Sequence, residues 1–308
     1  MAATIQFKTK KKDTTWVSFY DFEMLLAEAK DSIFKNKKAL TIVVQARANA
    51  SINTLIRLLS VVNQLSDMGV KVTLNFSGTT NRLLGYCETI GFFQNLSDDV
   101  VIKSGKDVHK TKRTKSSGNS YISINKISGN VFDTELPDKL ATKITKKIPN
   151  ISESLRSDLY IQFYTLFGEL TKNVCQHSQT ELNGFAALQI YKNRAEIVVC
   201  DSGIGLLESL RPTLAAHNSA YKGFSDKELI LEMLTNGISC KGKDEGGNGL
   251  MTCFRHAKRT NSDMHIRLEE EYYHFYRVAE KSNLVDSLRV SDNLLALSGT
   301  FISFAVPY

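Results

Sequence analysis

The chain lacks the features that mark membrane-spanning, exported and disulfide-stabilised proteins. No apolar run in its 308 residues approaches the roughly 20 residues of a bilayer-spanning helix, and the N-terminus shows no basic-then-apolar signal pattern. The cysteines are an odd set without a C-x-x-C pair, which argues against a disulfide framework or a zinc site. They are Cys87, Cys175, Cys200, Cys240 and Cys253. We therefore expect a soluble, cytoplasmic protein with reduced thiols and no membrane contact.

Internal repeats and low-complexity tracts are also missing, so an ordinary globular organisation is expected. A hydrophobic content of 42% supports a real core, and the length suits two domains. The net charge of +7 fits an anionic partner such as a nucleotide, an acidic protein or nucleic acid, and equally a soluble protein that is merely basic. No aromatic residue lies between the charges of the basic segment 103–115 to stack on bases, so nucleic-acid binding is not favoured.

Residues 1–102 show a strand–helix alternation that predicts a small α/β domain with at least two parallel strands. The expected strands are 4–8, 40–44 and 70–76, and the expected helices are 19–34, 51–68 and 81–90. This region resembles the STAS-type domain, the fold of anti-anti-sigma factors. That family carries an Asp-Ser dipeptide at a helix start, and its serine can be phosphorylated. Here the dipeptide is Ala50-Ser51, so we expect Ser51 to cap the helix rather than to accept a phosphoryl group.

Residues 103–148 read as a basic linker and connecting segment, or as a long exposed hairpin, with a helix near 138–147. A longer helix should follow over 153–176. It carries an apolar stripe of Leu159, Phe163, Leu166 and Leu170.

Glu169, Asn173 and His177 are spaced i, i+4 and i+8 in this helix, which places them along one other face. A carboxylate can accept a proton from water, and an amide oxygen is a hard ligand suited to magnesium. Taken alone, the triplet would more often be an ordinary solvated face.

Two glycine-containing segments follow. Asp201-x-Gly203-x-Gly205 ends the strand expected at 195–200. A carboxylate there can accept a hydrogen bond from an exocyclic amine such as that of adenine, although the same pattern also marks ordinary turns.

Gly246-Gly247-Asn248-Gly249-Leu250 should open a helix that runs to about residue 258. Its amide groups would form an anion site, with Lys241 and Lys243 adding charge just upstream. The alternative is a flexible surface loop. No Walker loop occurs.

The order of these segments carries more information than any one of them. Four segments follow one another along the chain: an E-x3-N-x3-H helix, D-x-G-x-G after a strand, G-G-x-G-L at a helix start, and Gly299-Thr300 at the start of the last strand. This layout resembles the GHKL ATPases, the superfamily of gyrase, histidine kinases and mismatch-repair ATPases. The resemblance covers residues 149–308 and implies a histidine kinase-like ATP-binding domain, a sandwich of a mixed sheet with helices on one face.

The resemblance also implies roles for individual residues, with ATP and Mg²⁺ as cofactors. Asn173 would hold Mg²⁺, and Glu169 would polarise the attacking water or hydroxyl. Asp201 would bind the adenine amine, with Gly203 and Gly205 lining the base pocket and Thr300 near the base through a water. The lid residues Gly247 and Gly249 would close over the phosphates, with Lys241, Lys243, Gly246 and Leu250 beside them. His177 would either face the phosphates or pack against its neighbours.

Three kinds of function fit this resemblance. A histidine kinase needs an upstream phosphoacceptor histidine, and the only upstream histidine, His109, lies in the basic segment. A serine/threonine kinase of the anti-sigma type and an ATPase that switches a partner protein fit equally, because Glu169 could activate a hydroxyl or a water. An ATP-binding module without turnover is a further alternative. We expect the switch, with a protein partner and a possible homodimer.

Overall fold

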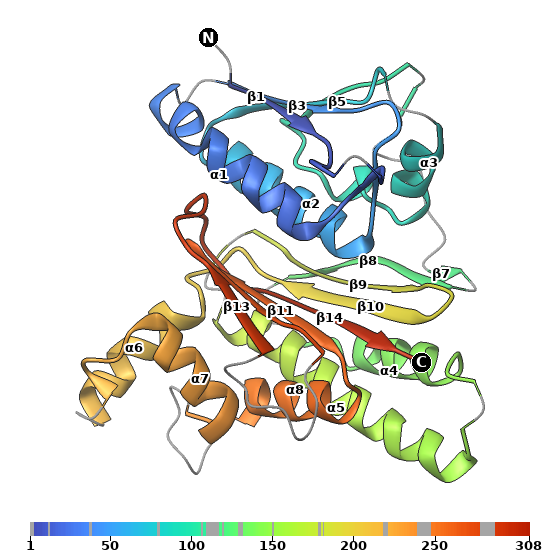
Figure 1. Ribbon diagram of the computed structural model, residues 1–308, viewed down its shortest axis with the longest axis vertical. Coiled ribbons are helices and arrows are strands. Elements are labelled where there is room, and N and C mark those ends of the chain that lie inside the picture. The colour runs from blue at the N-terminus through green and yellow to red at the C-terminus, as the bar shows by residue number, and fades with distance from the viewer. Residues whose placement is uncertain are drawn as a thin grey trace.

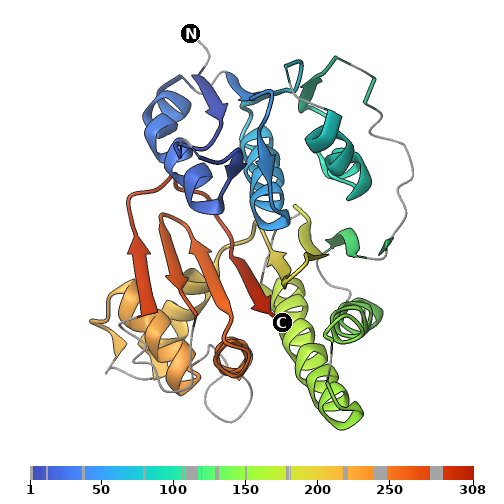
Figure 2. The same cartoon turned by 45° about the vertical axis from the view of Figure 1, so that its right-hand side comes forward.

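The computed structural model describes most of the chain as α/β structure with parallel and antiparallel sheets. The described residues are 3–11, 13–36, 39–78, 81–105, 107–108, 117–118, 120–128, 132–149, 151–177, 180, 182–217, 221–238, 248–277 and 287–308. Sheets and helices alternate in four layers (Figures 1 and 2). No helix among these residues is long and apolar enough to cross a membrane.

The first sheet confirms the parallel strands expected in the N-terminal region. Its order is β1 (Ala3–Phe7), β3 (Ala39–Val44), β5 (Lys71–Asn75) and β6 (Val101–Lys103), all parallel. The intervening helices are α1 (Phe19–Asn36), α2 (Ile52–Asp67) and α3 (Asn81–Thr89). Each crossover advances in the same direction along the sheet, and such connections are right-handed, so α1 and α2 cover the same face (Figure 1).

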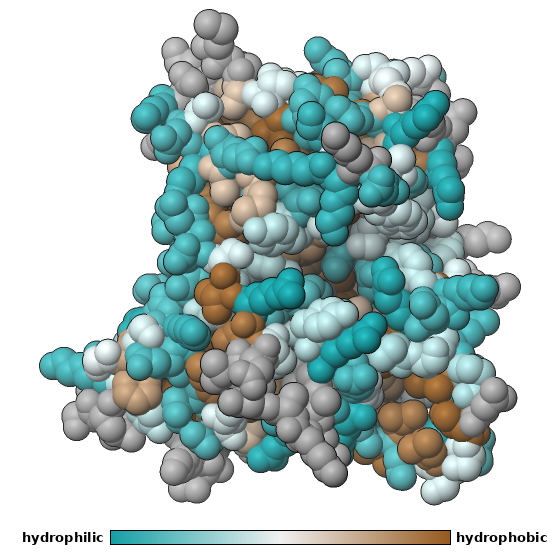
Figure 3. Space-filling model, in the orientation of Figure 1, coloured by the Kyte–Doolittle hydropathy of each residue, from teal (hydrophilic) through white to brown (hydrophobic). Residues whose placement is uncertain are grey.

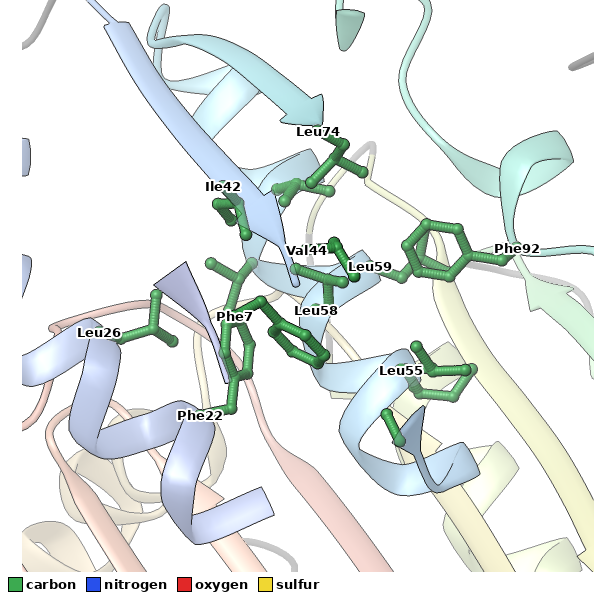
Figure 4. Close-up of a cluster of buried hydrophobic side chains, with 14 of the residues drawn as sticks. Phe7, Phe22, Leu26, Ile42, Val44, Leu55, Leu58, Leu59, Leu74 and Phe92 are labelled. Atoms are coloured by element: carbon green, nitrogen blue, oxygen red, sulfur yellow. The ribbon is translucent and has the colours of Figure 1, made fainter. Parts of the chain in front are cut away.

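Apolar residues from this sheet and from α1 and α2 meet in one core. Phe7, Ile42 and Leu74 point from the strands toward Phe22 of α1 and Leu58 of α2 (Figure 4), and all five are buried. A short parallel pair, β2 (Trp16–Val17) with β4 (Asn49–Ala50), and a 3₁₀ turn at Phe93–Asn95 complete this part.

The second sheet has eight strands, and every described pair in it is antiparallel. Its order is β13 (Leu288–Ser291), β12 (Glu271–Phe275), β11 (Asp263–Leu268), β14 (Phe301–Pro307), β10 (Arg194–Cys200), β9 (Gly184–Ile190), β8 (Tyr121–Ile127) and β7 (Ser117–Gly118). The mixed sheet implied by the resemblance is therefore corrected. Short turns make β9–β10 and β11–β12 into hairpins, and β14 enters between them antiparallel to both neighbours.

Strands β7 and β8 come from the segment that was expected to connect two domains, so this segment builds one edge of the second sheet. The basic residues at 109–116 within it lie outside the described residues. The helix expected near 138–147 is α4 (Glu135–Thr145), which packs along α5 (Glu153–His177).

Helices cover both faces of the second sheet. One face carries α5, α6 (Leu206–His217), α7 (Asp226–Asn236) and α8 (Asn248–Arg259). The other face lies against α1 and α2, so the helices-on-one-face arrangement holds only within the C-terminal part (Figure 1). Strand β10 shows why: Ile197 and Val199 belong to the core under α5, whereas Val198 and Cys200 belong to the core under α2.

Buried charge crosses the boundary between α1, α2 and the second sheet. Glu23 of α1 accepts hydrogen bonds from the Nε atoms of Arg57 on α2 and Arg267 on β11, the latter at 2.8 Å. All three side chains are almost completely buried. Burial alone would raise the pKa of Glu23, but the two guanidinium groups overcome it and hold that pKa below its usual range.

The N-terminus of α2 is also held by the second sheet. Ser51 has the backbone of an N-cap, as expected, but its hydroxyl makes no capping bond to the helix. The hydroxyl of Tyr191 instead accepts the N–H of Ile52 at 3.2 Å, and the Ser51 hydroxyl bonds to the side chain of Asn53 close to the buried carboxylate of Glu196.

Candidate functional site

Helix α5 presents Glu169 and Asn173 along a flank beside its buried stripe. Phe163, Leu166 and Leu170 are buried as expected, and both polar side chains are half-buried. Helix α8 packs against α5, with the ring of His256 edge-on to Phe163 at a centroid distance of 4.4 Å. The two helices are therefore held at a fixed separation next to the polar pair.

The first turn of α8 lies directly on Glu169 and Asn173. A Cβ placed on Gly249 would sit 3.1 Å from Oε2 of Glu169 and 3.3 Å from Nδ2 of Asn173. A larger residue at 249 would push both side chains away. The next residue, Leu250, is buried in the core and anchors the turn. A helix N-terminus, a carboxylate and an amide thus meet at one place.

Asp201 follows β10 and is fixed from three sides. Its N–H donates to the carbonyl of Thr300 at 2.9 Å, and its Oδ1 accepts the N–H of Gly203 at 2.8 Å. The side chain of Thr300 also donates to its carboxylate. Burial raises the pKa of Asp201 to about 6, although these hydrogen bonds oppose the shift. A carboxylate with two such bonds still has acceptor capacity for a further donor.

Glycine is required on both sides of Asp201. Gly205 has φ +88° and Gly299 has φ +94°, a region that side chains disfavour. A Cβ on Gly299 would lie 2.3 Å from the carbonyl oxygen of Asp201, so the strand that carries Thr300 can approach only because residue 299 is glycine.

Gly184 joins the two halves of the site and was not singled out from the sequence. A Cβ there would lie 2.5 Å from Cγ1 of Val174 and 2.7 Å from the carbonyl oxygen of Cys200. Val174 is the neighbour of Asn173, and Cys200 is the neighbour of Asp201. The α5 segment and the end of β10 therefore converge on one residue. Gly184 is the first residue of β9, which places it at this meeting point.

Some predicted site residues cannot be placed. Lys241, Lys243, Gly246 and Gly247 lie outside the described residues. His177 is the last residue of α5, and its side chain lies outside the described part as well. The structure thus brings together Glu169, Asn173, Gly249 and Leu250 in one group and Asp201, Gly203, Gly205 and Thr300 in the other.

A pocket of about 220 Å³ is lined by Gly205 and Gly299 but not by Asp201, Glu169 or Asn173. It has a single cation, Arg211, among six carboxylate residues: Glu208, Asp226, Glu269, Glu270, Glu271 and Asp292. Such a surface repels polyphosphate.

No group of three or more histidine, cysteine or acidic side chains in the described part could by itself hold a metal ion. No protein-family model matches the chain, and no curated protein matches its sequence. The chemistry of the site is therefore read from its residues: a hydrogen-bond acceptor at a strand end, and an amide and a carboxylate under a helix N-terminus.

Proposed function

We propose that residues 149–308 form a GHKL-type site for Mg-ATP, preceded by a STAS-like region, and that the chain is an ATPase-driven switch acting on a partner protein. One observation carries the proposal: the first turn of α8 rests on Glu169 and Asn173. These are the residues to which the resemblance assigns water and magnesium, and the helix start is the one to which it assigns phosphate.

The donor set suits the cofactor. The amide oxygen of Asn173 is a hard ligand of the kind that Mg²⁺ accepts in small number, the remaining ligands being phosphate and water. Asp201 offers an acceptor for an exocyclic amine, and the amides at the α8 N-terminus offer donors for an anion. When bound, ATP supplies the phosphoanhydride bond to be broken. Glu169 would orient and polarise the attacking water.

The position of Ser51 favours the switch over phosphoryl transfer within the chain. Its hydroxyl bonds to Asn53 and lies close to Glu196, which faces α2. Glu169 lies on α5, across the second sheet from α2. A phosphoryl group handled by Glu169 would have to cross that sheet to reach Ser51. A serine on a separate partner remains the alternative acceptor.

Calorimetry with ATP and Mg²⁺ tests the site. Asn173→Ala and Asp201→Ala should abolish binding, whereas Glu169→Ala should bind nearly as the wild type and lose turnover. Ser157→Ala, on the exposed side of α5, is the matched control and should bind normally. Unchanged ATP affinity in Asp201→Ala would defeat the assignment.

Label in the γ-phosphate of ATP then separates the functions. Label released as free phosphate, and lost in Glu169→Ala, supports the switch. Label on a serine of an added candidate partner supports the kinase. Tight binding with label in neither product identifies an ATP-binding module without turnover.

A further inference from the structure

Helix α5 exposes a face that packs against nothing in the described structure. It is formed by Asp158, Ile161, Thr165, Gly168 and Lys172, which follow one another in steps of three and four. Ile161 is 60% exposed, the most exposed large hydrophobic residue described, and Tyr164 beside it is also exposed. A Cβ on Gly168 would meet no atom within 4 Å. Figure 3 shows hydrophobic surface at this end of the molecule, over α4 and the N-terminal half of α5.

The residues on this face are ordered so that a second copy of the face, running in the opposite direction, would place complementary residues opposite each other. The five positions are spaced like the a and d residues of two heptads. Thr165 is at the centre, Ile161 and Gly168 flank it, and the oppositely charged Asp158 and Lys172 close the ends. In the described part of the chain, neither end charge makes an ion pair. A second copy of the face, turned by 180°, would place Asp158 opposite Lys172 at both ends.

We propose that this face of α5 binds the same face of a second copy of the chain, as an antiparallel helix pair about a twofold axis at Thr165. Ile161 of each copy would fill the space over Gly168 of the other, and the small residues would allow close approach of the helices. A partner of another kind would not require this reversal symmetry. Asp158 and Lys172 lie about 21 Å apart along the helix, so the two ion pairs fix the register.

The pairing does not depend on ATP binding. It does run beside the candidate site, because Lys172 precedes Asn173. The two sites of a dimer would therefore be held in a fixed relation to each other.

Sedimentation velocity of the full chain over a concentration series tests the proposal. The wild type should show a monomer–dimer equilibrium. Asp158→Lys and Lys172→Asp should each weaken it by about tenfold or more, because each turns two attractions into two repulsions. Asp31→Lys on α1, another exposed carboxylate whose side chain is 75% accessible, is the matched control and should leave the equilibrium unchanged.

Charge exchange makes the test specific. An equimolar mixture of the two single variants pairs opposite charges at both ends, so it should recover the wild-type dimer, as should the double variant D158K/K172D. Ile161→Asp should remain monomeric. The proposal is overturned if the wild type is monomeric throughout, if Asp158→Lys behaves like Asp31→Lys, or if neither the mixture nor the double variant recovers association.

Discussion

The buried Glu23 carboxylate should be among the most sensitive positions in the chain. It is the shared acceptor of two guanidinium groups, Arg57 and Arg267. Glu23→Gln keeps the shape but removes the charge, leaving two buried cations side by side. Losing one partner of a buried ion pair costs about 3–5 kcal/mol, and here both cations lose their counter-charge. We expect a loss of at least about 3 kcal/mol in the free energy of unfolding.

Urea unfolding followed by circular dichroism measures this loss. The control is Asp31→Asn on the same helix, whose exposed pair with Lys35 should contribute less than about 1 kcal/mol. The pH dependence gives a second check. The pKa of Glu23 is lowered in the folded protein, so its contribution is present above the ordinary carboxyl range and disappears as the pH falls through the lowered value.

Replacement of the whole cluster should have the opposite outcome. Glu23→Leu with Arg57→Met and Arg267→Met removes the desolvation cost together with the attraction, and should be neutral or stabilising. Arg57 also has a buried Nη2 atom without a hydrogen-bond partner in the described structure, which adds to that cost. A Glu23→Gln loss below about 1 kcal/mol would refute the reasoning, because it would mean that water reaches the cluster.

Three further substitutions test the site and the second sheet. Asp201→Asn should raise the free energy of unfolding at neutral pH by up to about 3 kcal/mol while ATP binding is lost, because a pKa raised from 3.8 to about 6 disfavours the ionised native state. This gain should fade between about pH 6 and pH 4. Gly299→Ala should cost about 1–3 kcal/mol or more in urea unfolding, against less than about 0.5 kcal/mol for Gly223→Ala, whose Cβ has open space. Burial lowers the pKa of His265 and of His274, which stacks on it, so the free energy of unfolding should fall as the pH drops below about 6.5. His265→Phe should make this pH dependence weaker. An unchanged pH dependence would show that these two histidines do not cause it.

Local patterns predict most of the helices and strands because their causes are local. The β-branched run expected as a strand at 40–44 forms β3. The glycines at 205 and 299 have the positive φ angles that the turn and strand entry require. Strand β13 and helix α6 were not expected, because the stretches that contain them have no clear period.

The packing of α2 against the second sheet could not be predicted from local patterns. Leu55, Leu58 and Leu59 form an amphipathic stripe, which predicts that the remaining residues face water. Arg57, Ser60 and Gln64 are nevertheless buried. Arg57 pairs with Glu23 of α1, and Ser60 bonds to Gln64 of α2 itself. Strands β9 and β10 lie against α2, and a local period carries no information about a layer that is added by residues more than a hundred positions away.

The motifs of the candidate site could be predicted from the sequence, but their arrangement in space could not. The spacing of Glu169 and Asn173 assigns them to one helix face, yet their contact with Gly249 depends on how α8 packs on α5. The approach of the end of β10, next to Asp201, to helix α5 depends on Gly184, where even a methyl group would meet Val174 and Cys200. Such close backbone approach is possible because glycine has no Cβ, so a pattern of side chains in the sequence does not predict it.

The position of α2 connects the two halves of the chain physically. It lies along β10, the strand that ends at Asp201, with Glu196 at the helix N-terminus and Cys200 near Arg57. The core under α2 contains residues of both sheets, so removing the N-terminal layer would expose Val198, Cys200 and Phe301 together. The two sheets therefore share this core. Any shift of β10 that a ligand at Asp201 produces would have to be accommodated by α2, because packed interiors move as units rather than stretch.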